Sequence, residues 1–224
     1  MSAPAFIHRF EAATSPGAAP LLLLHGTGGD ENDLVALGRA IAPDAALLSP
    51  RGNVLEHGMP RFFRRLTEGV FDEDDVRHQA NALADFVGDA RTRYRIASPI
   101  ALGYSNGANI AAAMLLLRPQ VLSGAILLRA MVPLSAAPRG DLAARPVLII
   151  SGAQDPIVPA QNAARLADLL RALRAAVEHR VLPTGHGLSN ADVTMARQWL
   201  RETTAQDGTT AVGVASHVAM PRHG

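Results

Sequence analysis

The sequence predicts an α/β protein with a mostly parallel central sheet and helices on both faces of that sheet. Short, entirely apolar runs such as Leu21 to Leu24 alternate along the chain with longer segments whose apolar residues recur at helical spacing. Apolar runs without alternation are typical of parallel strands, which are buried on both faces. Several of these runs end in glycine-containing loops. Strands that alternate with helices in this way favour a parallel sheet with right-handed crossovers.

Length and composition limit the classes of function. The chain has 224 residues, which is enough for one large core and too few for two comfortable domains. The formal net charge of +1 predicts neither nucleic-acid binding nor attraction to anionic membranes. There is no cysteine, which excludes a disulfide framework, a thiolate metal site and a thiol nucleophile. The N-terminal region lacks a signal or membrane-spanning pattern, so we expect a cytoplasmic protein without stable membrane insertion.

The order of elements follows from these patterns. Strands are predicted at residues 5–10, 21–24, 45–49, 99–102, 121–128, 146–151 and 177–182, and helices at 33–42, 72–94, 108–114, 160–173 and, after the cap at Ser189, 190–199. Residues 51–71 show no clean period and are predicted as a long ordered loop over the top of the sheet. Residues 202–224 lack a helical period. We therefore predict a domain over 1–201, with no separate lid domain, and a C-terminal tail over 202–224.

The clusters of charged residues are typical of helix ends and of solvent-exposed loops. Asp72, Glu73, Asp74 and Asp75 suit the N-terminal dipole of the predicted helix 72–94, and a metal site is the alternative. The arginines at 61, 64 and 65 are predicted to lie at a solvated loop edge. Ser189, with Asp192 three residues later, predicts a capping box for the last helix.

Ser105 lies at the predicted corner between a buried strand and a helix. The segment Gly103-Tyr-Ser-Asn-Gly107 fits G-x-S-x-G, which places a serine hydroxyl at an open strand-to-helix turn. A side chain at either glycine would collide with the strand or helix beside the corner. The helix N-terminus directs N–H groups toward the serine, which favours a developing oxyanion. The pattern predicts a nucleophile, and the alternative is a helix N-cap in an ordinary turn.

Two further strand-end loops carry the partners that a serine nucleophile needs. His186 lies between two glycines after the last strand and is the predicted base. Asp155 follows another strand, where a buried carboxylate would hold the imidazole tautomer, and the alternative is an Asx turn before Pro156. The order Ser105, Asp155, His186 matches nucleophile, acid and histidine in α/β-hydrolases. His25 is predicted to be a structural histidine that is satisfied by backbone groups.

A glycine-rich loop supplies the remaining part of the predicted site. In His25-Gly-Thr-Gly-Gly29 the backbone can approach a substrate carbonyl closely. We predict an oxyanion hole made of the backbone N–H groups of Thr27 and Asn106, each worth about 3 kcal/mol in the transition state. The same loop could cradle phosphate, but it lacks the Lys and Ser/Thr of a P-loop.

These motifs resemble those of the phospholipase/carboxylesterase family of small α/β-hydrolases, over residues 5 to about 201. The resemblance lies in the segments Leu24-His-Gly-Thr-Gly-Gly-Asp-Glu-Asn-Asp-Leu34, Gly103-Tyr-Ser-Asn-Gly-Ala-Asn-Ile110, Gly152-Ala-Gln-Asp-Pro-Ile-Val-Pro159 and Gly185-His-Gly-Leu188. The resemblance implies a serine esterase without metal or cofactor, acting on short-chain carboxylic esters and often dimeric. Details around Ser105 and residues 50–52 and 62–65 are similar to a bacterial branch linked to hydroquinone or aryl-ester hydrolysis.

The sequence therefore predicts a serine carboxylesterase that hydrolyses short-chain or aryl esters through an acyl-enzyme. An acyl thioesterase or lysophospholipase of the same fold is the alternative, although thioesterase relatives usually carry Gln where this chain has Asn106. A non-catalytic ligand-binding member is the second alternative. Apolar residues predicted to line the substrate pocket are Phe63, Phe71, Met131, Ile157 and Leu188, and each could equally belong to the core.

Overall fold

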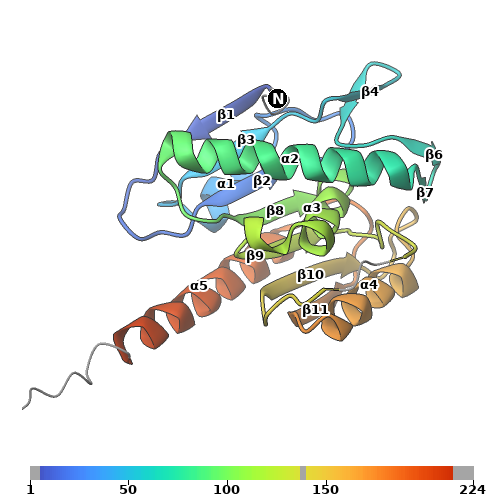
Figure 1. The fold of residues 1–224 in the computed structure, drawn as a ribbon. Helices are drawn as coiled ribbons and strands as arrows, with labels where there is room; N and C mark the ends of the chain where they lie inside the picture. The colour runs from blue at the N-terminus through green and yellow to red at the C-terminus, as the bar shows by residue number, and fades with distance from the viewer. Residues whose placement is uncertain (1–5, 137–139, 214–224) are drawn as a thin grey trace, which may run out of the picture.

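The structure, a computed structural model, describes residues 6–136 and 140–213 and is built around one seven-stranded sheet (Figure 1). The strand order is β1-β3-β2-β8-β9-β10-β11. The bounds are β1 His8–Glu11, β2 Leu21–Leu24, β3 Leu47–Pro50, β8 Ile100–Tyr104, β9 Gly124–Leu128, β10 Pro146–Gly152 and β11 Ala176–Leu182. The edge strand β1 pairs antiparallel with β3, and the other neighbours pair in parallel. The predicted fold class is confirmed.

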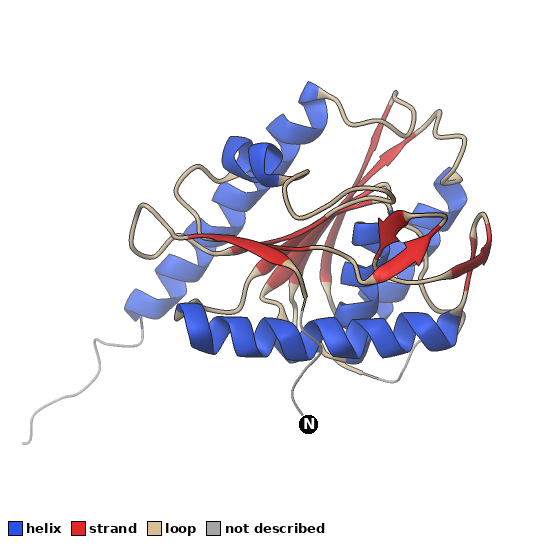
Figure 2. Cartoon of the chain, turned by 90° about the horizontal axis from the view of Figure 1, so that it is seen from above, coloured by secondary structure: helices blue, strands red, loops and turns tan. Residues whose placement is uncertain are grey.

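Helices cover both faces of the sheet (Figure 2). They are α1 Val35–Ile41, α2 Glu73–Tyr94, α3 Asn106–Leu117, α4 Ala160–Ala172 and α5 Asn190–Gly213. One core cluster joins α2, α3 and α4 to the sheet, and a second joins α1 and α5 to the opposite face. Within β2 the side chains alternate between the two clusters, with Leu22 and Leu24 in the first and Leu21 and Leu23 in the second. This double burial explains why β2 reads as an unbroken apolar run. Within the described residues, no helix has the length and hydropathy to cross a bilayer.

Residues 51–71 differ from the predicted loop. They form two β-hairpins, made of β4 Val54–Glu56 with β5 Met59–Arg61 and β6 Arg65–Thr67 with β7 Val70–Phe71. The first turn is His57-Gly58, with φ of 52° and 80°, the left-handed pair that a tight two-residue hairpin requires. Short hairpins with few buried side chains lack the apolar alternation that would have predicted them.

The boundaries of other elements also shift. The first strand begins at His8 rather than at residue 5, which lies outside the described residues. Strand β9 begins at Gly124 rather than at residue 121, because Pro119–Val121 forms a short 3-10 helix, η1. Helix α5 continues to Gly213 rather than ending at Trp199. Its extension projects past the sheet (Figure 1), so Arg201 and Glu202 are exposed and no apolar period marks this part of the helix. The division into a domain and a tail at residue 201 stays a prediction.

The acidic cluster opens α2, as predicted. The Asp72 carboxylate accepts the backbone N–H of Asp75 at 3.2 Å and caps the helix. Asp75 in turn accepts the backbone N–H of Arg64 at 2.7 Å, which fixes the end of the hairpin segment to the helix. These carboxylates therefore stabilise the N-terminus of α2 and its contact with the hairpin segment.

Candidate active site

Ser105 occupies a strained corner between β8 and α3. Its backbone has φ 52° and ψ −113°, a region that non-glycine residues rarely adopt and that costs about 1–3 kcal/mol. The backbone N–H of Ser105 donates to Leu128 O at 2.9 Å, and the carbonyl of Ser105 accepts from Asn109 at 3.0 Å. The serine side chain makes no cap hydrogen bond to the helix. Ser105 therefore occupies the N-cap position of α3, as the alternative has it, but its hydroxyl does not cap the helix.

The two glycines of the corner are required by close backbone contacts. A Cβ added at Gly103 would lie 2.5 Å from Gly107 O, and one added at Gly107 would lie 1.9 Å from Leu24 O. Both separations are far below van der Waals contact, and backbone atoms on either side cannot move away easily. The predicted steric reason for G-x-S-x-G is confirmed.

Ser105, His186 and Asp155 form one chain of hydrogen bonds. His186 Nε2 lies 3.1 Å from Ser105 Oγ, and His186 Nδ1 lies 2.8 Å from Asp155 Oδ2. The Asp155 side chain is buried, whereas His186 is 18% exposed. The three residues come from loops that follow β8, β10 and β11, which end at one edge of the sheet. The structure therefore brings together the three side chains that the sequence singled out; their catalytic roles stay a prediction.

The Asp155 carboxylate is held in the ionised form. Burial alone would raise its pKa, but the backbone N–H groups of Val158 and Ile157 and the His186 ring outweigh burial and hold the pKa below its usual value. The two N–H donors lie 2.9 and 2.8 Å from Oδ1. The Asx-turn interpretation of Asp155 is thus correct as well: one oxygen closes the turn while the other faces the imidazole.

Arg129, which no sequence motif predicted as a site residue, holds the loop that carries His186. Its Nε donates to Gly185 O at 3.1 Å and its Nη2 donates to Gly187 O at 3.0 Å, on either side of the histidine. Its guanidinium also forms a bidentate ion pair with Asp192, at 2.7 and 3.1 Å, and both side chains are fully buried. The signal that could have found it is an arginine directly after the apolar strand Gly124–Leu128, where a charge must have a buried partner.

Asp192 fulfils its predicted capping role in addition to this ion pair. Its carboxylate accepts the N–H and the hydroxyl of Ser189, both at 2.8 Å. Burial alone would raise the pKa of Asp192, but the Arg129 guanidinium and the Ser189 groups hold it below the usual value.

The glycine-rich loop places free backbone donors beside Ser105. Thr27 and Asn106 both line a cavity that contains Ser105. Their backbone N–H groups donate to no acceptor within the described part of the chain. The arrangement fits the predicted oxyanion hole, whose donors must be left free for substrate.

His25 fixes this loop, as predicted for a structural histidine. Its Nε2 accepts the Gly52 N–H at 2.9 Å, and its Nδ1 lies 2.6 Å from Gly26 O, so the proton is assigned to Nδ1. Burial lowers the pKa of His25, consistent with a neutral ring. A further bond, from the Gly28 N–H to Pro60 O at 2.9 Å, joins the loop to the first hairpin.

The cavity beside Ser105 measures about 40 Å³ and contains three of the five predicted pocket residues, Phe71, Met131 and Ile157. The other two do not line it. Phe63 is fully buried and packs edge-on behind Phe71, with ring centroids 5.0 Å apart. Leu188 packs against the core cluster of α1 and α5.

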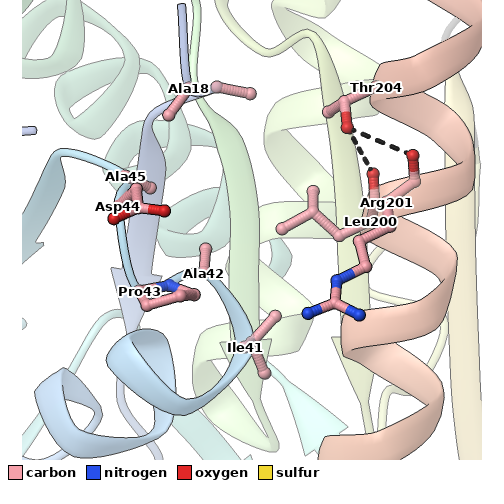
Figure 3. A pocket seen from close by; sticks show the side chains of 10 residues that line it. Ala18, Ile41, Ala42, Pro43, Asp44, Ala45, Leu200, Arg201 and Thr204 are labelled. Carbon is pink, nitrogen blue, oxygen red and sulfur yellow. Dashed lines mark hydrogen bonds between the residues drawn. The ribbon is translucent and has the colours of Figure 1, made fainter. Parts of the chain in front are cut away.

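A larger groove of about 250 Å³ lies elsewhere, between α5 and the turn that precedes β3 (Figure 3). Small apolar side chains such as Ala18 and Ala42 line it, together with Leu200 and Thr204 of α5. Ser105, Asp155 and His186 do not line this groove. The converging strand ends, rather than cavity size, therefore locate the candidate active site.

Comparison with known proteins agrees with this geometry. The family model described as Phospholipase/Carboxylesterase matches residues 7–204. The chain belongs to the phospholipase/carboxylesterase family. The chain is 46% identical to the protein MhqD of Bacillus subtilis (strain 168) over 197 residues, which cover 87% of this chain and 98% of MhqD.

Solved structures of two carboxylesterases superpose closely on the chain. A carboxylesterase of Bacillus cereus has a TM-score of 0.86 at 41% identity, covering 88% of this chain and 94% of that one. A carboxylesterase from Mesorhizobium loti has a TM-score of 0.83 at 36% identity, with the same coverage. The family resemblance drawn from the sequence motifs is confirmed.

Proposed function

We propose that the protein is a serine carboxylesterase that hydrolyses short-chain or aryl carboxylic esters through an acyl-enzyme on Ser105. The observation that carries the proposal is the His186 ring, which lies between Asp155 and Ser105 at 2.8 and 3.1 Å. Membership of the phospholipase/carboxylesterase family supports the same activity. The cytoplasm remains the proposed location.

In the first half of the reaction, Ser105 Oγ attacks the ester carbonyl carbon while His186 Nε2 takes the hydroxyl proton. The carbonyl oxygen becomes an oxyanion, which accepts hydrogen bonds from the N–H groups of Thr27 and Asn106. The tetrahedral intermediate then collapses. Its carbon–oxygen bond to the alcohol breaks as His186 returns the proton to the leaving oxygen. Asp155 keeps the Nδ1 proton in place and stabilises the imidazolium.

In the second half, water replaces the alcohol. His186 takes a proton from the water, whose oxygen attacks the acyl carbon of the Ser105 ester. The same N–H groups bind the second oxyanion. Collapse releases the carboxylic acid and returns the proton to Ser105 Oγ, so the enzyme is restored without a redox step or a cofactor.

Arg61, Arg65 and Glu68 line the cavity beside Ser105, so it offers little continuous apolar surface to a long acyl chain. This supports the short-chain esterase over the lysophospholipase alternative. A thioester with an equally small acyl group would fit the same space, so ester and thioester substrates need to be compared directly.

The test is hydrolysis of p-nitrophenyl esters from acetate to laurate by the wild type, Ser105→Ala and a matched control. Ser151→Ala is that control, because Ser151 Oγ also pairs with a histidine, His179 Nε2 at 2.8 Å, but is buried away from the cavity. We expect activity on short chains that Ser105→Ala abolishes and Ser151→Ala retains. Folded wild type that hydrolyses no ester and leaves Ser105 unlabelled by a fluorophosphonate would refute the proposal.

A further inference from the structure

Arg61 is enclosed beside the candidate nucleophile. The prediction of a solvated loop edge for Arg61 was wrong, because the side chain is 3% exposed. It lines the same cavity as Ser105 and Thr27. Arg64, in contrast, is 64% exposed and forms an ion pair with Asp72 at 3.0 Å. Burying a guanidinium costs free energy unless its five N–H donors find acceptors.

The hydrogen bonds of Arg61 leave one side of the guanidinium available. Nε donates to Phe63 O at 3.2 Å. Nη1 donates to Thr27 Oγ1 at 2.8 Å and to Glu56 Oε2 at 3.2 Å. No acceptor in residues 6–136 or 140–213 bonds to Nη2. The Nη2 donors are therefore those left for a molecule that enters the cavity.

The charges around the cavity favour an anion. Arg65 Nε also donates to Glu56, at 3.0 Å, so two guanidinium groups share one carboxylate and leave a net positive charge at this wall. Glu68 also lines the cavity and makes the formal charge of the four side chains zero, but it is exposed, so water screens its carboxylate, whereas Arg61 is 3% exposed. Burial lowers the pKa of Arg61, because its charge has lost solvation that Glu56 restores only in part. An anionic oxygen at Nη2 would offset that loss.

The cavity lies on the acyl side of the site. The alcohol oxygen must leave next to His186 Nε2, which protonates it. His186 does not line this cavity, whereas Ser105 and the two predicted oxyanion donors, Thr27 and Asn106, do. A group that fills the cavity is thus attached to the carbonyl carbon rather than to the leaving oxygen.

We propose that this cavity recognises the acid portion of an ester that carries a second, anionic oxygen group on a short chain, with Arg61 as the residue that binds it. The substrate class is thus monoesters of short dicarboxylic acids or of similar acids. The proposal rests on the esterase function proposed above. It makes Arg61 a specificity-determining residue in addition to a support for Thr27.

The experiment compares two methyl esters of nearly equal shape in a pH-stat: monomethyl succinate, which carries a carboxylate, and methyl 4-methylpentanoate, which does not. The enzymes are the wild type, Arg61→Met and the control Arg64→Gln, with p-nitrophenyl acetate as a reference substrate. Arg61→Met should stay folded because Arg65 still neutralises Glu56. Inhibition of the wild type by succinate and by 4-methylpentanoate provides a measurement that needs no variant.

We expect the wild type to prefer the succinate ester in kcat/KM by about ten- to hundredfold, the range for a hydrogen bond to a charged group. Arg61→Met should abolish this preference, Arg64→Gln should keep it, and succinate should be the stronger competitive inhibitor. If Arg61→Met lowered kcat/KM equally for both esters, the inference would be overturned, and Arg61 would be only a support for the oxyanion loop. Equal use of both esters by the wild type would also overturn it. If p-nitrophenyl acetate and both methyl esters all resist hydrolysis, the esterase function itself fails.

Discussion

Replacing Arg129 with methionine tests how the His186 loop is held. The ion pair with Asp192 is bidentate and neither side chain is exposed to solvent. Removing one partner of such a pair leaves an uncompensated buried charge, which costs about 3–5 kcal/mol. Because domains of this size are stable by about 5–15 kcal/mol, Arg129→Met should remain folded at low temperature but unfold at much lower urea concentration.

The double variant Arg129→Met, Asp192→Asn separates charge from packing. Asparagine keeps an oxygen that can accept from Ser189 but removes the negative charge. We therefore expect the double variant to regain a large part of the stability that Arg129→Met loses. Unfolding can be followed by the fluorescence of Trp199, the one tryptophan in the sequence, which packs in the core on α5.

Activity gives a second readout for the same variants. Arg129 binds the carbonyls on both sides of His186, so its loss should lower kcat more than it raises KM, under conditions where the variant is fully folded. A free energy of unfolding reduced by less than about 1 kcal/mol in Arg129→Met, or a double variant less stable than the single one, would refute the reasoning from a buried charge.

Two further predictions concern the corner and the loop beside it. Gly107→Ala should prevent folding, because its Cβ would meet the carbonyl oxygen of Leu24 at 1.9 Å. The control Gly88→Ala lies within α2 with no atom within 4 Å of its Cβ, so it should raise the free energy of unfolding by about 0.5–1 kcal/mol. Urea titration compares the two variants, and a soluble, active Gly107→Ala protein would contradict the steric account. His25 should make stability depend on pH, because burial lowers its folded pKa below the unfolded value of about 6.5. The unfolded chain then binds more protons in this range, so stability is present above about pH 6.5 and falls as pH decreases toward the folded pKa, by at most about 1.4 kcal/mol per pH unit. His25→Gln should reduce that slope while its amide can still accept the Gly52 N–H, and an unchanged slope would show that other groups cause it.

The corner around Ser105 was predictable from sequence because its geometry is local. Gly103 and Gly107 flank Ser105 within five residues, and their steric role follows from the turn itself. His186 and Asp155 were predictable because parallel strands end at one edge, so loops far apart in sequence must meet there. The element order was predictable for the same reason: buried parallel strands leave clear apolar runs.

The roles of Arg129 and Arg61 were not predicted, because each side chain is buried through contacts that the sequence alone does not reveal. Arg129 is buried because Asp192, 63 positions away, neutralises it. Arg61 is buried by hydrogen bonds to Thr27 and Glu56, on a hairpin whose strands are only three residues long. A surface charge and a buried charge look alike in sequence, since the difference lies in tertiary contacts.

The two hairpins between β3 and α2 form one wall of the cavity beside Ser105. They supply Arg61, Arg65 and Phe71 to the cavity, while Ser105 and Met131 come from other parts of the chain. Each hairpin closes its own short ladder rather than joining the central sheet. The first hairpin also holds the glycine-rich loop, through the bonds from Gly28 to Pro60 and from Arg61 to Thr27. The second hairpin, which supplies Arg65 and Phe71, makes no such bond to Ser105 or to that loop in the described residues. Differences in substrate between relatives should therefore concentrate between residues 65 and 71, where the cavity wall can change without moving Ser105.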